Sequence, residues 1–190
     1  MNKYISALVV VLIILLFPGE TFAQISAGAQ ITVNIPENCL IDSNGAPVNM
    51  TLPTTVAGAP LPTVSNSDMY VRLSSVNPGG TYRLVTARIS GGTVPAGTRL
   101  TLAAALSTNS NGAGNFGRVL SPIILNSIDQ DIIRGIGNCY TGTGYTDGYR
   151  LTYSWGPNGL TTDYRLINAT GAPTTITIML TISAPDGNNN

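Results

Sequence analysis

Apolar and polar side chains alternate with a period of two residues in short stretches from one end of the chain to the other. Within residues 174–183 four branched apolar side chains share one parity: Ile176, Ile178, Leu180 and Ile182. Successive side chains of a β-strand point to opposite faces, so this spacing predicts a strand with one buried face. Similar stretches predict strands over residues 31–35, 48–52, 69–76, 82–89, 99–106, 119–125, 130–136, 149–155 and 164–167.

Turn-forming residues separate these stretches and favour antiparallel connections. The sequence Asn-Pro-Gly-Gly at residues 77–80 follows one predicted strand, and Gly-Gly at residues 91–92 follows the next. Glycine and proline supply the backbone angles that a chain reversal requires. No stretch has the spacing of a long amphipathic helix, so the strands must bury their apolar faces against one another. We therefore expect an all-β fold of roughly ten short strands in two antiparallel sheets, a β-sandwich, with a closed barrel as the alternative.

The first 23 residues have the features of a secretory signal peptide. Lys3 precedes an apolar run over residues 5–17, and Thr-Phe-Ala at residues 21–23 supplies a cleavage site. The run is shorter than the roughly 20 residues that a helix needs to cross a bilayer, although an uncleaved anchor is the alternative. We expect residues 24–185 to form a single secreted domain without a membrane span, followed by a disordered polar tail at 186–190. The expected location is the periplasm, the cell surface or the extracellular medium.

Charge and composition narrow the chemistry that is open to the chain. It has nine basic residues, nine acidic residues and no histidine, and offers no basic surface for nucleic acid. Triads of the Ser-His-Asp or Cys-His type need an imidazole, so the sequence excludes them. Paired carboxylates drawn from Glu37, Asp129 and Asp131 are the remaining catalytic alternative, but solvated turns explain these acids more simply. We therefore expect a protein that is not an enzyme and that uses no cofactor or metal.

Two cysteines, Cys39 and Cys139, lie beyond the predicted signal peptide. An even number of cysteines in an oxidising compartment favours a disulfide. In the chain-entropy model, a bridge that closes a loop of about 100 residues contributes about 4.7 kcal/mol. We therefore expect a Cys39–Cys139 disulfide, with two buried free thiols as the alternative.

Residues 135–149 form the most distinctive stretch, because they combine many glycines with three tyrosines and an acid. Glycines let a loop approach other backbone closely, and tyrosines offer flat amphipathic surface to a glycan or a protein. The stretch is therefore a candidate binding loop, with Tyr140, Tyr145, Asp147 and Tyr149 as its candidate residues. Alternatively, the glycines mark bulges and a hairpin connection, and the tyrosines cover the core. Four large side chains at every second position are more typical of a buried core than of a binding surface: Tyr149, Leu151, Tyr153 and Trp155.

The expected start of the mature chain has the same alternation, with an apolar or small residue at every second position from Ile25 to Ile35. Such a segment is suited to adding as a strand to a neighbouring subunit, as in fibres built by donor-strand assembly. It is equally suited to being the first strand of its own sheet. The candidate donor residues are Ile25, Ile31, Val33 and Ile35, and the candidate partners are other copies of the chain or other extracellular subunits.

Three short elements fall within residues 133–153: Gly-Ile-Gly at 135–137, Tyr-Thr-Gly-Thr-Gly at 140–144 and Leu-Thr-Tyr at 151–153. In these elements the chain resembles a group of secreted bacterial β-sandwich proteins to which no activity is assigned. In its low charge and its strands rich in Thr, Gly and Asn, it more loosely resembles fimbrial or adhesin-type subunits. The resemblance implies an exported sandwich of the immunoglobulin-like or pilin-like kind.

The expected function is that of a secreted structural or adhesive subunit, fimbria-like or surface-associated, without catalysis. The alternative is an extracellular carbohydrate- or protein-binding module that uses the loop from Tyr140 to Tyr149.

Overall fold

A computed structural model describes residues 28–53, 55–159 and 161–185. The predicted signal peptide at 1–23, the candidate donor residue Ile25 and the predicted tail at 186–190 lie outside the described residues. The chain divides into two units between Ile35 and Pro36, and every assigned strand belongs to the second unit. In the part of the chain that is described, no helix has the length and apolar character that a membrane span requires.

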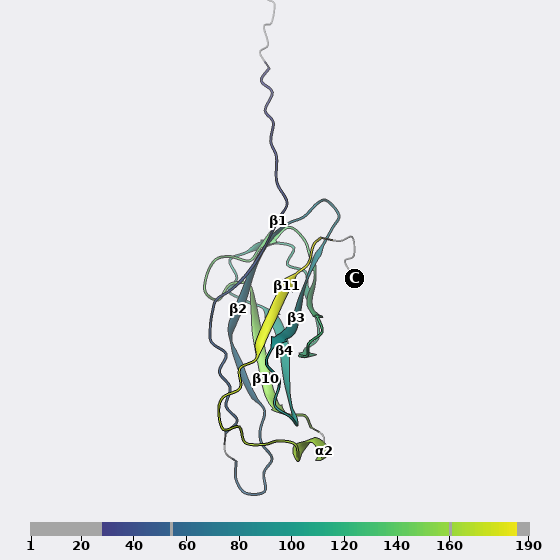
Figure 1. The fold of residues 1–190 in the computed structure, drawn as a ribbon. Helices are drawn as coiled ribbons and strands as arrows, with labels where there is room; N and C mark the ends of the chain where they lie inside the picture. The colour runs from purple at the N-terminus through teal and green to yellow at the C-terminus, as the bar shows by residue number, and fades with distance from the viewer. Residues whose placement is uncertain (1–27, 54, 160, 186–190) are drawn as a thin grey trace, which may run out of the picture. The chain divides into compact units, whose positions relative to one another are not determined.

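The described residues of the second unit form strands joined by loops, with one short helix (Figure 1). The helix is α2 (Thr161–Tyr164). The strands are β1 (Asn38–Ser43), β2 (Val64–Val76), β3 (Arg83–Gly91), β4 (Thr98–Leu106), β5 (Ala113–Gly114), β6 (Arg118–Val119), β7 (Ile123–Ile124), β8 (Gln130–Ile136), β9 (Cys139–Tyr140), β10 (Tyr149–Pro157) and β11 (Thr177–Ile182).

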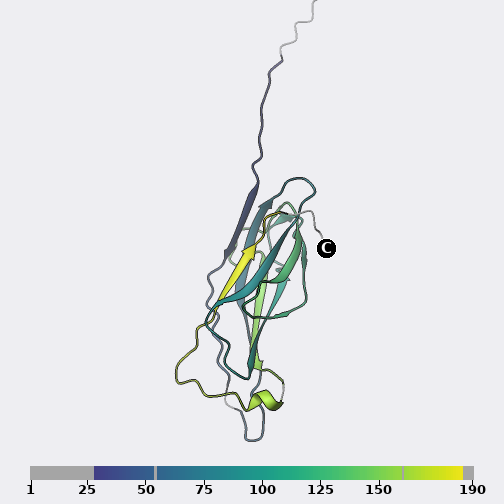
Figure 2. The same ribbon diagram turned by 45° about the vertical axis from the view of Figure 1, so that its right-hand side comes forward.

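These strands form two antiparallel sheets, which confirms the prediction of two stacked sheets. One sheet has the order β5-β9-β2-β10-β4-β7, and β1 pairs with β2. The other sheet has the order β11-β3-β8-β6. Figures 1 and 2 show β3 and β11 lying across the face of the sheet that contains β2, β10 and β4.

Inward-facing side chains from both sheets fill the space between them. The buried members of the first sheet include Val71, Leu73, Leu102, Tyr149 and Leu151, and those of the second include Val85, Ala87, Ile133 and Ile136. Each fully buried Val, Leu or Ile side chain stabilises the fold by about 1.5–3 kcal/mol relative to exposure. The stripe that begins at Tyr149 is therefore part of the core. Along β11 the side chains alternate between exposed and partly buried, as the sequence predicts.

Within the second unit, three predicted strands differ from the structure. Residues 119–125 do not form one strand, because the chain passes from β6 in one sheet to β7 in the other across Pro122, which cannot donate to a ladder. Residues 164–167 instead contain the end of α2 and the turn that follows it, in which Leu166 N–H donates to Asp163 O. Residues 48–52 are extended without an assigned strand, and β1 is a strand that the alternation did not predict.

The expected disulfide is absent, and the sheet register gives the reason. Cys39 of β1 and Cys139 of β9 are both free, and both lie opposite Ser75, on the two sides of β2. Two inter-strand spacings of about 4.8 Å separate their Cα atoms by about 10 Å, whereas a disulfide needs less than about 7 Å. The even number of cysteines and the expected oxidising compartment therefore led to the wrong pairing state.

Candidate functional site

A groove with a cavity volume of about 1410 Å³ lies along one side of the sandwich. Its lining comes from β1, β2, β4, β10 and β11 and from the connecting residues 48–53 and 167–174. Among the described lining residues the one charged side chain is Asp42. Most small-molecule pockets have volumes of roughly 300–1,000 Å³, so a groove of this size suits a chain segment better than a small ligand.

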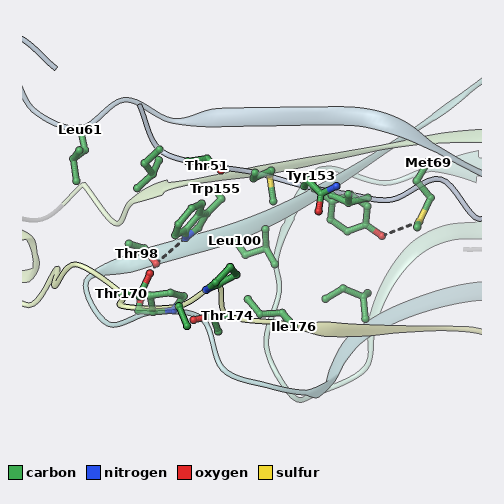
Figure 3. Close-up of a pocket in the computed structure, with 18 of the residues that line it drawn as sticks. Thr51, Leu61, Met69, Thr98, Leu100, Tyr153, Trp155, Thr170, Thr174 and Ile176 are labelled. Carbon is green, nitrogen blue, oxygen red and sulfur yellow. Dashed lines mark hydrogen bonds between the residues drawn. The ribbon is translucent and has the colours of Figure 1, made fainter. Parts of the chain in front are cut away.

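Two rows of apolar side chains line this groove. The first row lies on the connecting residues after β1: Val48, Met50 and Leu52. The second row lies at and along β11: Ile176, Ile178 and Leu180. Figure 3 shows the segment that carries Thr51 and the segment that carries Ile176 on opposite sides of Leu100 and Trp155. All six side chains are partly buried, so each keeps apolar surface that the core does not cover.

The floor of the groove is aromatic and aliphatic, and its polar atoms are paired within the domain. Trp155 Nε1–H donates to Thr98 Oγ1 at 2.9 Å, and the Tyr153 hydroxyl donates to the sulfur of Met69 at 3.5 Å (Figure 3). Burial raises the pKa of Tyr153 to about 12, so its hydroxyl stays protonated at neutral pH. The floor therefore presents ring and methyl surface rather than free donors or acceptors.

The backbone beside the groove lacks strand partners on that side. In the described part of the chain β11 is the end strand of its sheet and pairs with β3 alone. Residues 48–53 have no strand assignment. An end strand presents a row of N–H and C=O groups that another chain can pair with. The groove thus combines apolar side-chain surface with a free sheet edge.

The described N-terminal residues 28–35 end the first unit and contain no strand. The strand predicted over residues 31–35 is therefore absent, because an alternating segment becomes a strand only when a neighbouring backbone completes its ladder. Ile31, Val33 and Ile35 are 82%, 82% and 81% exposed. Three large apolar side chains of one parity thus face solvent in a chain of low charge.

The candidate binding loop is held in place by two of its own predicted residues. Asp147 is 2% exposed, and its carboxylate accepts hydrogen bonds from Gly144 N–H at 2.6 Å and from Asn111 N–H at 3.4 Å. Tyr149 is buried, and its hydroxyl donates to the Phe116 carbonyl oxygen. Burial and, secondarily, Cys139 raise the pKa of Tyr149. Asp147 and Tyr149 therefore support the loop rather than line its surface.

The two remaining candidates of this loop face solvent. Tyr140 is 54% exposed and Tyr145 is 62% exposed. Arg72 fixes the backbone between them by donating to Thr143 O at 2.8 Å. That these tyrosines recognise a glycan or a protein stays a prediction, which a glycan array tests.

Arg83 is a site residue that the sequence analysis missed. Its side chain is 3% exposed, and it donates to Asn77 Oδ1 at 2.8 Å, Ser183 O at 2.8 Å and Glu37 Oε1 at 2.5 Å. The guanidinium therefore ties the residue that precedes β1 to the residue that follows β11. The alternation along β3 could have revealed it, because Arg83 stands at the same alternate positions as Val85 and Ala87 and therefore shares their inward face.

The acids considered for catalysis each pair with a different arginine. Glu37 pairs with Arg83, Asp129 with Arg88 at 3.5 Å, and Asp131 with Arg134. Among the described residues, no group of three or more His, Cys, Asp or Glu side chains is arranged to hold a metal.

The free thiols lead to a prediction about reactivity and pH. Cys139 is 8% exposed, and burial raises its pKa from 9.0 to about 11. A thiol reagent at pH 8 should therefore modify Cys39 readily and Cys139 only on unfolding. Because the unfolded thiol loses its proton at a lower pH, its contribution to stability is full below pH 9 and is lost as pH rises through about 11.

Counting reactive thiols before and after denaturation without reductant checks this prediction, together with melting temperatures at pH 8 and pH 10.5. Reductant should leave the melting temperature unchanged. Zero thiols in the denatured, unreduced protein would contradict the free-thiol state.

Protein-family models, curated proteins and solved structures were all compared with the chain, and none of them matches it. The groove, the exposed segment and the loop are therefore the features on which a function must rest.

Proposed function

We propose that the protein is a non-catalytic structural subunit that acts outside the cytoplasm and joins a fibre or another surface-associated assembly by strand addition. One observation carries this proposal: an exposed alternating segment and an apolar groove beside a free sheet edge occur in the same chain. Large exposed apolar surfaces mark sites of protein association. Strand addition joins two such surfaces, because backbone hydrogen bonds give affinity and side-chain pockets give specificity.

Two further features support this role. The signal-peptide pattern of residues 1–23 favours export to the periplasm, the cell surface or the medium. The two-sheet architecture with an end strand beside an open groove is what an immunoglobulin-like or pilin-like subunit needs if a neighbour is to complete it.

Strand-linked assemblies often resist detergent until they are heated, so an unboiled denaturing gel tests the proposal. The full chain, expressed for export and purified from the periplasm, should give a ladder of oligomers that boiling reduces to a monomer. Deleting residues 24–35 should remove the ladder, whereas deleting residues 186–190 should leave it. A single monomer band from the full chain without boiling would overturn the proposal.

A further inference from the structure

In the described part of the chain, β11 pairs with β3 on one side and has a free edge on the other. We propose that two copies of this chain pair antiparallel along β11, with a two-fold axis at Leu180, so that their four-stranded sheets form one continuous sheet. This pairing goes beyond the proposed function, because it joins β11 to β11 and involves no residue outside the second unit.

The β11 edge lacks the features that usually prevent strands from pairing at their edges. Among the other described strands with a single partner strand, β5, β6 and β7 are two residues long, and β1 carries Asp42. β11 has six residues, with neither a charged side chain nor a proline. Short strands, charges and prolines protect exposed edges, so an edge without them is suited to pairing. Because β11 carries no charge, two copies of it meet without like-charge repulsion.

The ladder between β11 and β3 determines which backbone groups of β11 point to the free edge. Ser183 N–H donates to Leu84 O at 2.9 Å, and the register then runs without a shift from Ile182 to Ile178. In an antiparallel ladder, residues that bond to the partner strand alternate with residues that do not. The N–H and C=O groups of Ile178, Leu180 and Ile182 therefore point away from β3, toward the free edge.

Side-chain parity determines where the two-fold axis can lie. Directly opposite residues of an antiparallel pair share a face, so an axis between two residues would place inward side chains opposite exposed ones. With the axis at Leu180, each Leu180 lies opposite its counterpart, and Ile178 of one copy lies opposite Ile182 of the other. These are the residues with free N–H and C=O groups, so the two strands exchange about six hydrogen bonds.

The regular part of β11 distinguishes this axis from its neighbours. An axis at Met179 would place Ile182 opposite Ile176, which precedes the irregularity at the start of β11. An axis one residue after Leu180 would require residues that follow β11. The axis at Leu180 pairs residues 178–182 with themselves, and these residues form an uninterrupted ladder with β3.

The dimer covers the edge that the proposed strand addition requires. A chain within the dimer therefore cannot accept a further strand beside β11 until the two copies separate. Covering the edge in this way also limits its pairing with unrelated chains. A two-fold interface closes on itself, so this contact gives a dimer and not a fibre.

Cysteine pairs across the joined strands test the register. With the axis at Leu180, Met179 of one copy lies opposite Thr181 of the other on the exposed face, in a pair without mutual hydrogen bonds. The Cα atoms of such a pair are about 4.5 Å apart, a distance that suits a disulfide. In the full chain with Cys39→Ser, which removes the more accessible native thiol, a mixture of Met179→Cys and Thr181→Cys should form a covalent dimer on mild oxidation.

Each cysteine variant alone is the control for this mixture. Two copies of the same variant place their thiols at diagonal positions about 7–8 Å apart, so covalent dimers should form at least ~10-fold more slowly. Rapid dimers from Met179→Cys alone would place the axis at Met179 and overturn the register. Absence of covalent dimers from the mixture would overturn the interface.

A proline at Leu180 tests the backbone contacts. Leu180→Pro removes an N–H that does not bond to β3, and an edge strand tolerates proline at such a position. By symmetry the dimer loses two hydrogen bonds, so its dissociation constant should rise at least ~30-fold. The matched control Leu180→Ala loses the side chain but keeps the N–H, and should raise the constant less than ~5-fold.

Analytical ultracentrifugation of the full chain measures both constants, and circular dichroism with the melting temperature establishes that both variants are folded. Equal weakening by Leu180→Pro and Leu180→Ala would overturn pairing through the backbone of β11. The cysteine mixture does not depend on whether the proline variant folds.

Two gels separate this dimer from the proposed fibre. Covalent dimers are read after boiling without reductant, whereas the fibre is read as a ladder of the unboiled, unmodified chain. Covalent dimers without a ladder would support the dimer and overturn the proposed function. A ladder without covalent dimers would overturn the dimer and leave the proposed function intact, and absence of both would overturn both.

Discussion

Replacing Glu37 with alanine should lower the free energy of unfolding by about 3 kcal/mol, although half of its side chain is exposed. The guanidinium of Arg83 is buried, and Glu37 is the acid that neutralises it. Removing one partner of a buried ion pair costs about 3–5 kcal/mol because a charge stays in a medium of low dielectric constant. We expect the lower end of this range, since water can reach Arg83 once the carboxylate is gone. Urea unfolding monitored by tryptophan fluorescence measures the change.

The same argument predicts a rescue. In the double variant Glu37→Ala with Arg83→Met, no buried charge remains, and most of the lost stability should return. The matched control is Asp42→Ala, which breaks the more exposed pair of Asp42 and Arg72 and should cost less than about 1 kcal/mol. A double variant that is less stable than Glu37→Ala would show that Arg83 acts on stability mainly through its hydrogen bonds and not through its buried charge.

This ion pair matters for the proposed assembly because of its position. Arg83 joins Glu37, just before β1, to the carbonyl of Ser183, just after β11. It therefore holds together the two strands that flank the groove at one end. Loss of Glu37 should accordingly weaken association as well as folding.

Gly148→Ala should be among the most damaging substitutions in the chain, with a loss of about 3–5 kcal/mol. Gly148 has a φ of +87°, and a Cβ there would lie 2.1 Å from the carbonyl oxygen of Val71. That oxygen belongs to β2, which pairs with β10 at the next residue, Tyr149. The backbone cannot yield without breaking this ladder. Thermal and urea unfolding measure the loss.

Gly159→Ala is the matched control for this steric effect. Gly159 has a similar φ of +90°, but nothing lies within 4 Å of the position of a Cβ. Replacing Gly159 with alanine therefore costs only the strain of a non-glycine residue at positive φ, about 1–2 kcal/mol. Equal losses at Gly148 and Gly159 would contradict the contact with Val71 as the cause.

Local periodicity determined much of this protein from the sequence alone. Alternation correctly placed the central strands, the inward face of β11 and the core stripe that begins at Tyr149, because side-chain parity follows from the backbone geometry of any strand. The sequence alone also excluded catalysis by an imidazole, because the chain contains no histidine. That conclusion depends on which side chains are present and not on where the fold places them.

Pairing between distant segments was decided only by the tertiary structure. The sequence could not show that Cys39 and Cys139 flank the same residue, Ser75, because strand order is set by long-range hydrogen bonds and core packing. It could not show that an inward arginine on β3 has Glu37 as its partner. Nor could it show that the rows on residues 48–52 and 176–180 line one groove. Alternation specifies which face of a strand is apolar, whereas the partner of that face depends on how the sheets come together.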